Sequence, residues 1–167
     1  RLFELSSVEA RKTLNRTERV DVGELLVETL ATMRPAFEAA GVGLEAMGGA
    51  GATLTGEAFL LRQALVNLLQ NALDFSPAGG RVVLRCVAES GRIIFAVEDE
   101  GPGVPDYGLG RVFERFYSLP RPVSGQKSTG IGLSLVREIA RLHGGDTTLA
   151  NRLEGGARAE LWIPLAA

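Results

Sequence analysis

The chain has 167 residues, the size of one domain that can bury a substantial core. Its net charge of −2, from 18 basic and 20 acidic residues, argues against a nucleic-acid or membrane-surface protein that binds through bulk charge. The one cysteine, Cys86, is expected to pack as a small hydrophobe, and no apolar run is long enough to span a bilayer.

The first 18 residues have Leu2, Leu5 and Val8 at helical spacing, but too few apolar positions to bury by themselves. We therefore expect this segment to be the end of a longer helix whose packing partners lie elsewhere.

The rest of the chain predicts strands, helices and one long loop. We expect a strand at 19–22, a helix at 23–40 ended by Gly41, and two weak strands at 42–47 and 51–55 around a glycine-rich turn. A helix at 56–75, two strong strands at 81–89 and 92–100, and a loop at 101–129 should follow. A helix at 131–143 and two strands at 146–151 and 157–165 should complete the order. Ser90–Gly91 should form a hairpin turn, the last two strands should form a closing hairpin, and the loop should contain a short helix near 109–115. Such a long loop is usually functional or mobile. This pattern predicts an α+β fold with one mostly antiparallel sheet and helices on one face.

The helix expected at 56–75 has a polar face opposite its leucines. On a helical wheel the apolar stripe is Leu61, Leu65, Leu68 and Ala72. The opposite side collects Gln63, Asn67, Gln70, Asn71 and Asp74, with Asn71 at the boundary with the core. Asparagine is a mediocre helix former, so helix formation does not explain two of them, yet the wheel alone favours a solvated face over a binding site.

Two glycine-rich segments follow this helix along the chain. In "VEDEGPGVP" a strand ends in Asp99, and Gly101 and Gly103 permit a tight turn and close backbone approach to a ligand. In "KSTGIGLSLV", Gly130 and Gly132 open an apolar helix, whose N-terminal N–H groups favour anions such as phosphate. The spacing matches neither a P-loop nor a Rossmann fingerprint, and each signal is weak alone.

Together, and in this order, the segments resemble the N, G1, F and G2 boxes of the ATP-binding domain of sensor histidine kinases, the GHKL or Bergerat fold. The matching stretches are "NLLQNALDFSP", "DEGPGVP", "RVFERFYSLP" and "STGIGLSLV", and "EGGARAELWIP" resembles the closing hairpin. The resemblance covers about residues 20–165, and the stretch around 104–133 is most similar to the CreC-type sensor kinases. It implies a two-layer α/β sandwich with a mostly antiparallel mixed sheet of about five strands, about three helices on one face and a mobile ATP lid.

The resemblance also implies roles for individual residues. Asp99 would accept a hydrogen bond from the adenine amino group, and Asn71 would ligate Mg²⁺ through its carbonyl oxygen. Asn67, the residue implied as catalytic, would lie beside the triphosphate. Residues 117–129 would form the lid, anchored by Phe113 and Phe116. The residues implied to bind ATP are Asn67, Asn71, Asp74, Asp99, Gly101, Gly103, Val104, Arg115, Tyr117, Lys127, Ser128, Thr129, Gly130, Ile131, Gly132 and Leu133.

Asn67 also separates branches of this family. The ATP-hydrolysing branch, which includes gyrase and the large heat-shock chaperones, has a glutamate at the matching position as the base for water. An amide cannot take that proton. The resemblance therefore implies that the domain holds ATP for transfer to another nucleophile and hydrolyses it slowly.

That nucleophile would be a histidine outside this chain. The only histidine here, His143, lies at a helix end, where a dipole or capping role is the simpler reading. Residues 1–18 would then be the C-terminal remnant of the dimerisation and phosphoacceptor helix, and 19–167 the ATP-binding domain. The implied partners are that dimerisation domain and a cognate response regulator, with no nucleic acid. The whole protein would be a membrane-bound homodimer with this domain in the bacterial cytoplasm, and this fragment alone would be monomeric.

Asp74 departs from the commonest family pattern, which has a lysine near the phosphates. A carboxylate facing a triphosphate is repulsive unless Mg²⁺ lies between them or the side chain turns away. Lys127 and Arg115 are candidates to supply the positive charge, or are solvated surface residues. Two alternatives stay open: a serine kinase of the anti-sigma-factor type on the same fold, and a pseudokinase module that binds a partner without nucleotide.

Overall fold

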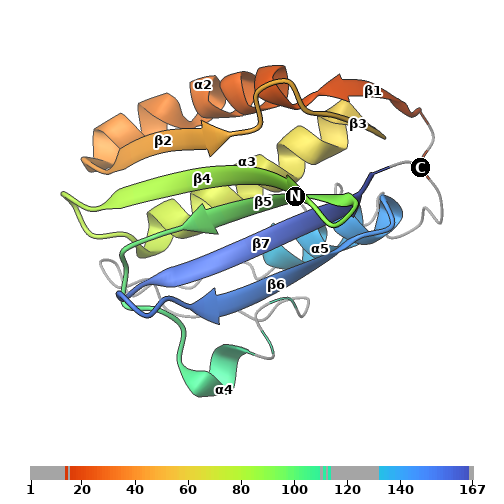
Figure 1. The fold of residues 1–167 in the computed structure, drawn as a ribbon. Coiled ribbons are helices and arrows are strands. Elements are labelled where there is room, and N and C mark those ends of the chain that lie inside the picture. Colours follow the sequence, from red (N-terminus) through yellow and green to blue (C-terminus); the bar gives the residue numbers. More distant parts are fainter. Residues whose placement is uncertain (1–13, 15, 110, 112, 114–131, 166–167) are drawn as a thin grey trace.

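The computed structural model describes residues 14, 16–109, 111, 113 and 132–165, and the structural statements below concern these residues (Figure 1). The elements in chain order are β1 (Glu18–Asp21), α2 (Val22–Ala40), β2 (Gly43–Gly48), β3 (Thr53–Gly56), α3 (Ala58–Phe75), β4 (Arg81–Glu89), β5 (Arg92–Glu98), α4 (Asp106–Leu109), α5 (Gly132–Leu142), β6 (Asp146–Asn151) and β7 (Ala157–Pro164). No described helix is long and apolar enough to cross a membrane.

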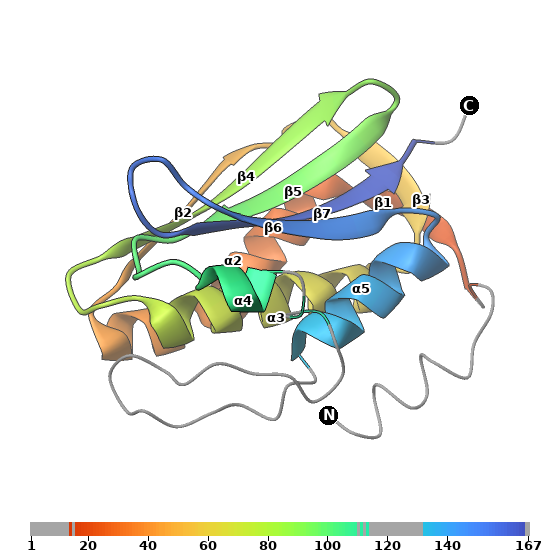
Figure 2. The ribbon, with the colours of Figure 1, turned by 90° about the horizontal axis from the view of Figure 1, so that it is seen from below.

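The main sheet has five strands in the order β2-β4-β5-β7-β6. β2 and β4 are parallel, and the other neighbours are antiparallel. The long helices α2, α3 and α5 lie together on one side of the sheet, as Figure 2 shows most clearly. The predicted α+β fold, with a mostly antiparallel mixed sheet covered by three helices on one face, is therefore confirmed.

Both predicted hairpins are present. Ser90 (φ 51°) and Gly91 (φ 74°) connect β4 to β5 with positive φ at both central positions, the requirement of a type I′ turn. β6 and β7 pair antiparallel and close the chain. The hairpin turns thus follow from local sequence.

The weak strands β2 and β3 do not lie in one sheet. β2 joins the main sheet beside β4, whereas β3 pairs with β1 in a separate two-stranded sheet. Positive φ angles at Gly48, Gly49 and Gly51 let the chain cross between the two sheets. Val20 and Leu54, which face each other in the small sheet, are both buried in the core.

Two other boundaries differ from the sequence-based expectation. β5 ends at Glu98, one residue before Asp99, and the short helix lies at Asp106–Leu109, earlier than the expected 109–115. The carbonyl oxygen of Pro105, the residue before this helix, accepts its first hydrogen bonds, from the N–H groups of Gly108 and Leu109.

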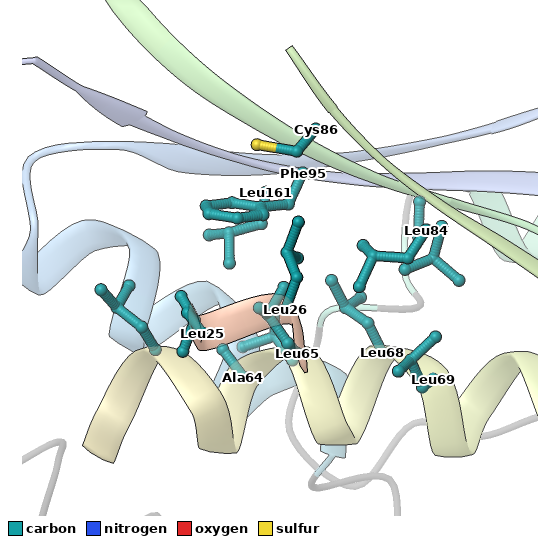
Figure 3. Packing of buried hydrophobic residues seen from close by; sticks show 14 of the residues in the cluster. Leu25, Leu26, Ala64, Leu65, Leu68, Leu69, Leu84, Cys86, Phe95 and Leu161 are labelled. Carbon is teal, nitrogen blue, oxygen red and sulfur yellow. The ribbon is translucent and has the colours of Figure 1, made fainter. Parts of the chain in front are cut away.

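The core lies between the helical layer and the sheet (Figure 3). Leu61, Leu65 and Leu68 of α3 are at most 1% exposed and belong to the core cluster, as the helical wheel predicts. Figure 3 shows Leu65 and Leu68 facing the sheet residues Leu84 and Phe95. Cys86 is part of this core, and burial raises the pKa of its thiol to about 11, so it is confirmed as a small hydrophobe.

His143 joins the end of α5 to the start of α3. The backbone N–H of Glu57, the residue before α3, donates to His143 Nε2 at 3.1 Å. Because Nε2 accepts, the proton is on Nδ1, which donates to the Ile139 carbonyl at 2.8 Å. The side chain is buried with both ring nitrogens hydrogen-bonded, so it caps the last turn of its own helix, α5, and also binds the residue that precedes α3.

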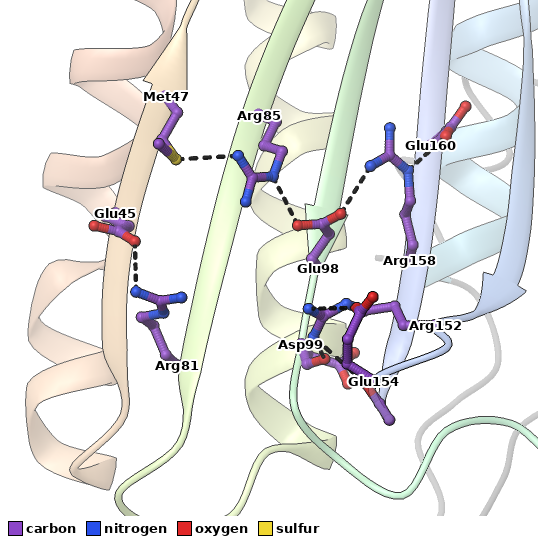
Figure 4. A network of polar contacts seen from close by, with 11 residues as sticks. Glu45, Met47, Arg81, Arg85, Glu98, Asp99, Arg152, Glu154, Arg158 and Glu160 are labelled. Atoms are coloured by element: carbon purple, nitrogen blue, oxygen red, sulfur yellow. Dashed lines mark hydrogen bonds and ion pairs between the residues drawn. The ribbon is translucent and has the colours of Figure 1, made fainter.

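The sheet face opposite the helices carries a network of charges (Figure 4). Glu98 forms salt bridges with Arg85 on one side and Arg158 on the other, each at 2.7 Å, and Arg158 also forms a salt bridge with Glu160 at 2.7 Å. Burial acts to raise the pKa of Glu98, but the hydrogen bonds and charges of the two arginines outweigh it and lower the pKa. This network fixes β5 between its neighbours immediately before Asp99.

Candidate functional site

The described candidate residues come from three elements: the polar stripe of α3, the turn that follows β5, and the first turn of α5. On α3, Asn67, Asn71 and Asp74 are four and three residues apart and therefore lie along one face. α5 packs beside α3 under the same side of the sheet (Figure 2).

Asn67 is the most buried polar residue of this stripe, at 2% exposed. Its Nδ2 donates to the carbonyl oxygen of Gly132, the first residue of α5, at 3.4 Å. Its Oδ1 is buried and accepts no hydrogen bond within the described part of the chain. An unpaired buried carbonyl costs about 1–3 kcal/mol, so this oxygen marks a place where a ligand could supply the missing donor or a cation.

The burial of Asn67 corrects one expectation, because the wheel alone favoured a solvated face. In the structure Asn71 is half-buried, in keeping with its predicted place at the boundary with the core, whereas Asn67 is enclosed because α5 packs against this part of α3. A helical wheel cannot include the second helix.

Asp74 is oriented by its own helix. The Gln70 amide Nε2 donates to Asp74 Oδ1 at 2.9 Å, one helical turn away. Asp74 is partly exposed, and its part in nucleotide binding stays a prediction. The Asn71 side chain makes no hydrogen bond to another described residue, so its carbonyl oxygen can serve as the ligand that the family resemblance implies.

Asp99 is a buried carboxylate, 7% exposed, at the carboxyl end of β5. Its Oδ1 accepts backbone N–H groups from Gly101 at 3.0 Å and Ala157 at 3.2 Å. Among the described residues no donor reaches Oδ2. Burial raises the pKa of Asp99, although the two backbone hydrogen bonds and the positive charge of Arg152 act to lower it. The carboxylate is thus held by one oxygen, and the other can take a donor from a ligand.

Gly101 and Gly103 are required by contacts inside the protein. A Cβ on Gly101 would overlap the carbonyl oxygen of Phe75 at the end of α3. Gly103 has φ +80°, and a Cβ there would lie 2.8 Å from Asn151 Oδ1. The turn after Asp99 is therefore packed closely between the end of α3 and the end of β6. This packing explains why glycine is needed at both positions without the close approach of a ligand that the sequence suggested.

Three residues at the β6–β7 connection also contribute to the site, and the sequence did not predict them: Asn151 at the end of β6, and Arg152 and Gly156 in the turn. Asn151 and Val104 exchange two hydrogen bonds, and Arg152 Nη1 donates to the Asp99 carbonyl at 2.9 Å. A Cβ on Gly156 (φ +84°) would overlap the same carbonyl. In the sequence these residues lie in "NRLEGG", a stretch that predicts only a turn.

Part of the predicted site lies outside the described residues. This applies to the expected lid at 117–129, the anchor Phe116, and the candidates Arg115, Tyr117, Lys127, Ser128, Thr129, Gly130 and Ile131. At the edges of this gap, Leu133 packs against the core and the Arg137 guanidinium lies 5.2 Å from the Phe113 ring centre.

The arrangement matches a known class of ATP-binding proteins. Residues 56–167 match the family described as "Histidine kinase-, DNA gyrase B-, and HSP90-like ATPase", which is more than half of the chain. The chain belongs to this family, and within it to the ATP-binding catalytic domains of two-component sensor histidine kinases.

Individual relatives agree with this assignment. The chain is 52% identical to Sensor protein CreC of Escherichia coli (strain K12) over 105 residues, which are 63% of this chain and 22% of that protein. It is 30% identical to the circadian input-output histidine kinase CikA of Synechococcus elongatus over 167 residues, covering 98% of this chain and 22% of that protein. The chain therefore spans about a fifth of the length of these relatives.

Solved structures show the same fold. The catalytic domain of histidine kinase ThkA superposes with a TM-score of 0.80 at 21% identity, over 92% of this chain and all of that one. Full-length ShkA in complex with AMPPNP gives a TM-score of 0.83 at 28% identity, over 99% of this chain and 35% of that one.

Proposed function

We propose that this domain binds Mg²⁺–ATP and positions the γ-phosphate for transfer to a histidine of a dimerisation domain outside the described residues. The phosphoryl group would then pass to an aspartate of a response regulator. The observation that carries the proposal is Asp99: a buried carboxylate with Oδ1 held by two backbone N–H groups and Oδ2 open to a ligand donor such as the adenine amino group.

Asn67 and Asn71 fit the other end of the nucleotide. The buried Oδ1 of Asn67, which has no hydrogen-bond partner among the residues that the structure describes, suits a site that a ligand completes. The amide oxygen of Asn71, one turn along α3, is a hard ligand of the kind that Mg²⁺ accepts beside phosphate oxygens. When bound, Mg²⁺ would neutralise phosphate charge and help to align the triphosphate.

The residues of the chain would act mainly by binding and positioning. Asp99 would fix the base, and Asn67 would lie beside the phosphates. Since the Asn67 amide cannot accept a proton from water, hydrolysis in the absence of a protein acceptor should be slow. Catalysis would come from holding the γ-phosphate in line with the incoming imidazole.

The same proposal extends to the parts that the structure does not describe. Residues 19–167 would be the catalytic domain, and 1–18 the end of the dimerisation helix, of which only 14 and 16–18 are described. Ser128, Thr129 and the following glycines would bind phosphates from the lid side. The whole protein would be a homodimer anchored in the bacterial inner membrane, with this domain in the cytoplasm.

The first experiment is titration of the chain with a fluorescent ATP analogue, with and without Mg²⁺. We expect saturable binding that ATP displaces and Mg²⁺ strengthens, and absence of binding at millimolar concentration would refute the proposal. The same titration of Asp99→Asn tests the adenine contact, and Asp99→Asn should bind the analogue more weakly than wild type. Glu100→Gln is its matched control, because it removes one charge from the neighbouring residue, which is exposed and accepts a hydrogen bond from the Arg81 N–H.

A second experiment identifies the acceptor. The domain is mixed with a separately prepared dimerisation domain and ATP labelled at the γ-phosphate. We expect label on the dimerisation domain that is lost in acid and stable in base, as phosphohistidine is. Acid-stable label would favour the serine kinase alternative.

A further inference from the structure

The turn after β5, residues 99–104, is held at both ends by consecutive residues of a distant hairpin. At one end, Arg152 Nη1 donates to the Asp99 carbonyl at 2.9 Å. At the other, the Val104 N–H donates to Asn151 Oδ1 at 2.7 Å, and Asn151 Nδ2 donates to the Val104 carbonyl at 2.8 Å. Asn151 is the last residue of β6 and Arg152 follows it, near the end of the sheet where Figure 4 shows Asp99 and Arg152 together.

We infer that Asn151 is a positioning residue of the nucleotide site, acting through Val104 on the turn that carries Asp99. This inference rests on the proposed function. The oxygen of the Asn151 amide accepts from the Val104 N–H, and its nitrogen donates to the Val104 carbonyl. The side chain therefore pairs with the Val104 backbone in the way that two hydrogen-bonded residues of a sheet pair with each other. Only one orientation of the amide satisfies both bonds.

The hairpin itself does not need this side chain. Asn151 already pairs with Ala157 through the backbone at the end of the β6–β7 ladder. The turn beyond it is closed by backbone bonds between Arg152 and Gly156 at 2.9 Å and between Gly155 and Arg152 at 3.1 Å. Asparagine is also disfavoured in strands. The side chain is exposed, and its two hydrogen bonds go to a residue 47 positions away in sequence.

The hydrogen bonds between Asn151 and Val104 restrict the turn after β5, whose conformation positions Asp99. Gly103 precedes Val104 with φ +80°, a conformation that glycine leaves readily. With Val104 released, residues 101–104 would sample more conformations, and nucleotide binding would have to order them again. Asn151 should therefore strengthen nucleotide binding without touching the reacting atoms.

The test compares wild type, Asn151→Ala and Thr148→Ala. Thr148 is an exposed residue of the same strand with no side-chain hydrogen bond to a described residue, so its variant controls for truncation on β6. Two quantities are measured: hydrogen exchange of the Val104 amide without nucleotide, and the Kd of the fluorescent ATP analogue.

In Asn151→Ala we expect Val104 amide exchange to accelerate about two- to tenfold, the effect of losing one ordinary hydrogen bond. The Kd should rise by about the same factor. In phosphotransfer to the separate dimerisation domain, KM for ATP should rise while kcat stays within about twofold of wild type, a split that general destabilisation would not produce. Thr148→Ala should match wild type in all three.

The inference is overturned if wild type binds the analogue and Asn151→Ala binds it equally well, or if kcat falls while KM is unchanged. Equal Val104 exchange in both proteins would also overturn it, and this measurement needs no nucleotide. If wild type itself binds no nucleotide, the proposed function fails, and the inference fails with it.

Discussion

Replacing Asp99 by asparagine should weaken nucleotide binding and, at the same time, leave the empty domain as stable as before or more stable. The amide keeps an oxygen that can accept the Gly101 and Ala157 N–H groups now bound to Oδ1. What it removes is a negative charge that burial disfavours, as the raised pKa of Asp99 indicates.

The pH dependence of this effect has a defined sign. A carboxyl whose pKa is higher in the folded than in the unfolded state stabilises the fold most below the unfolded value of about 3.9 and loses that contribution as pH rises through the folded pKa. Asn cannot ionise. The unfolding free energy of Asp99→Asn relative to wild type should therefore increase as pH rises through the folded pKa of Asp99 and stay constant above it.

Binding should change in the opposite direction. A hydrogen bond to a charged group contributes about 1.5–3 kcal/mol, so Asp99→Asn should weaken nucleotide affinity roughly ten- to a hundredfold. At a ligand concentration of about 100 times the wild-type Kd, linkage stabilises wild type by about 2.7 kcal/mol, whereas the variant should gain only about 0.4–1.4 kcal/mol. For a domain of this size that is a Tm rise of about 5–11 °C against about 1–6 °C.

Thermal unfolding with and without nucleotide measures both effects in one experiment, with Glu100→Gln as the charge control. An equal nucleotide-induced Tm rise in Asp99→Asn and wild type would refute the role of Oδ2 as the ligand acceptor. A variant that is less stable than wild type without nucleotide, at neutral pH, would refute the argument from desolvation.

Three further substitutions test neighbouring features. Asn67→Asp puts a charge at a position that is 2% exposed; it should lower the unfolding free energy by about 1–3 kcal/mol and ATP affinity at least about tenfold, as measured by urea unfolding and titration. Gly156→Ala, whose Cβ would overlap the Asp99 carbonyl, should destabilise by about 2–5 kcal/mol, whereas Gly155→Ala, with open space around the Cβ, should cost only about 1–2 kcal/mol in the same urea assay. Glu98→Gln should cost about 1 kcal/mol at pH 7, because its arginine partners are partly exposed. Since folding lowers the pKa of Glu98, the difference in unfolding free energy from wild type should decrease as pH falls through that lowered pKa, as measured by urea unfolding over a descending pH series.

The fold was predictable where local patterns determine it. The period of α3, the positive-φ turn at Ser90–Gly91 and the alternation of β7 all appear in the sequence and are present in the structure. The pairing of β2 and β3 was not predictable. Each is short and carries little register information, and its partner strand is chosen by packing of distant segments.

The site was predictable to the level of motif but not of contact. The spacing of Asn67 and Asn71 indicates a shared helix face, but the burial of Asn67 depends on α5, which reaches it from Gly132, 65 positions later. Asn151 and Arg152 contact the Asp99 turn across 47 and 53 positions, and their sequence context predicts only a hairpin end. Contacts at such separations leave no periodic signal in one sequence.

Two polar groups of the proposed site, on Asn67 and Asp99, are not explained by stability alone, and in the proposed function they contact opposite ends of the nucleotide. Within the described part of the chain, the buried Oδ1 of Asn67 has no hydrogen bond, and the buried carboxylate of Asp99 is bound through one oxygen only. A domain selected only for stability would replace either by an apolar residue or would complete its hydrogen bonds. Asn67 lies on a long helix, and Asp99 follows the central strand β5 directly. Binding one ligand that spans both would recover the cost at each, which is why stability and affinity should move in opposite directions when Asp99 is replaced.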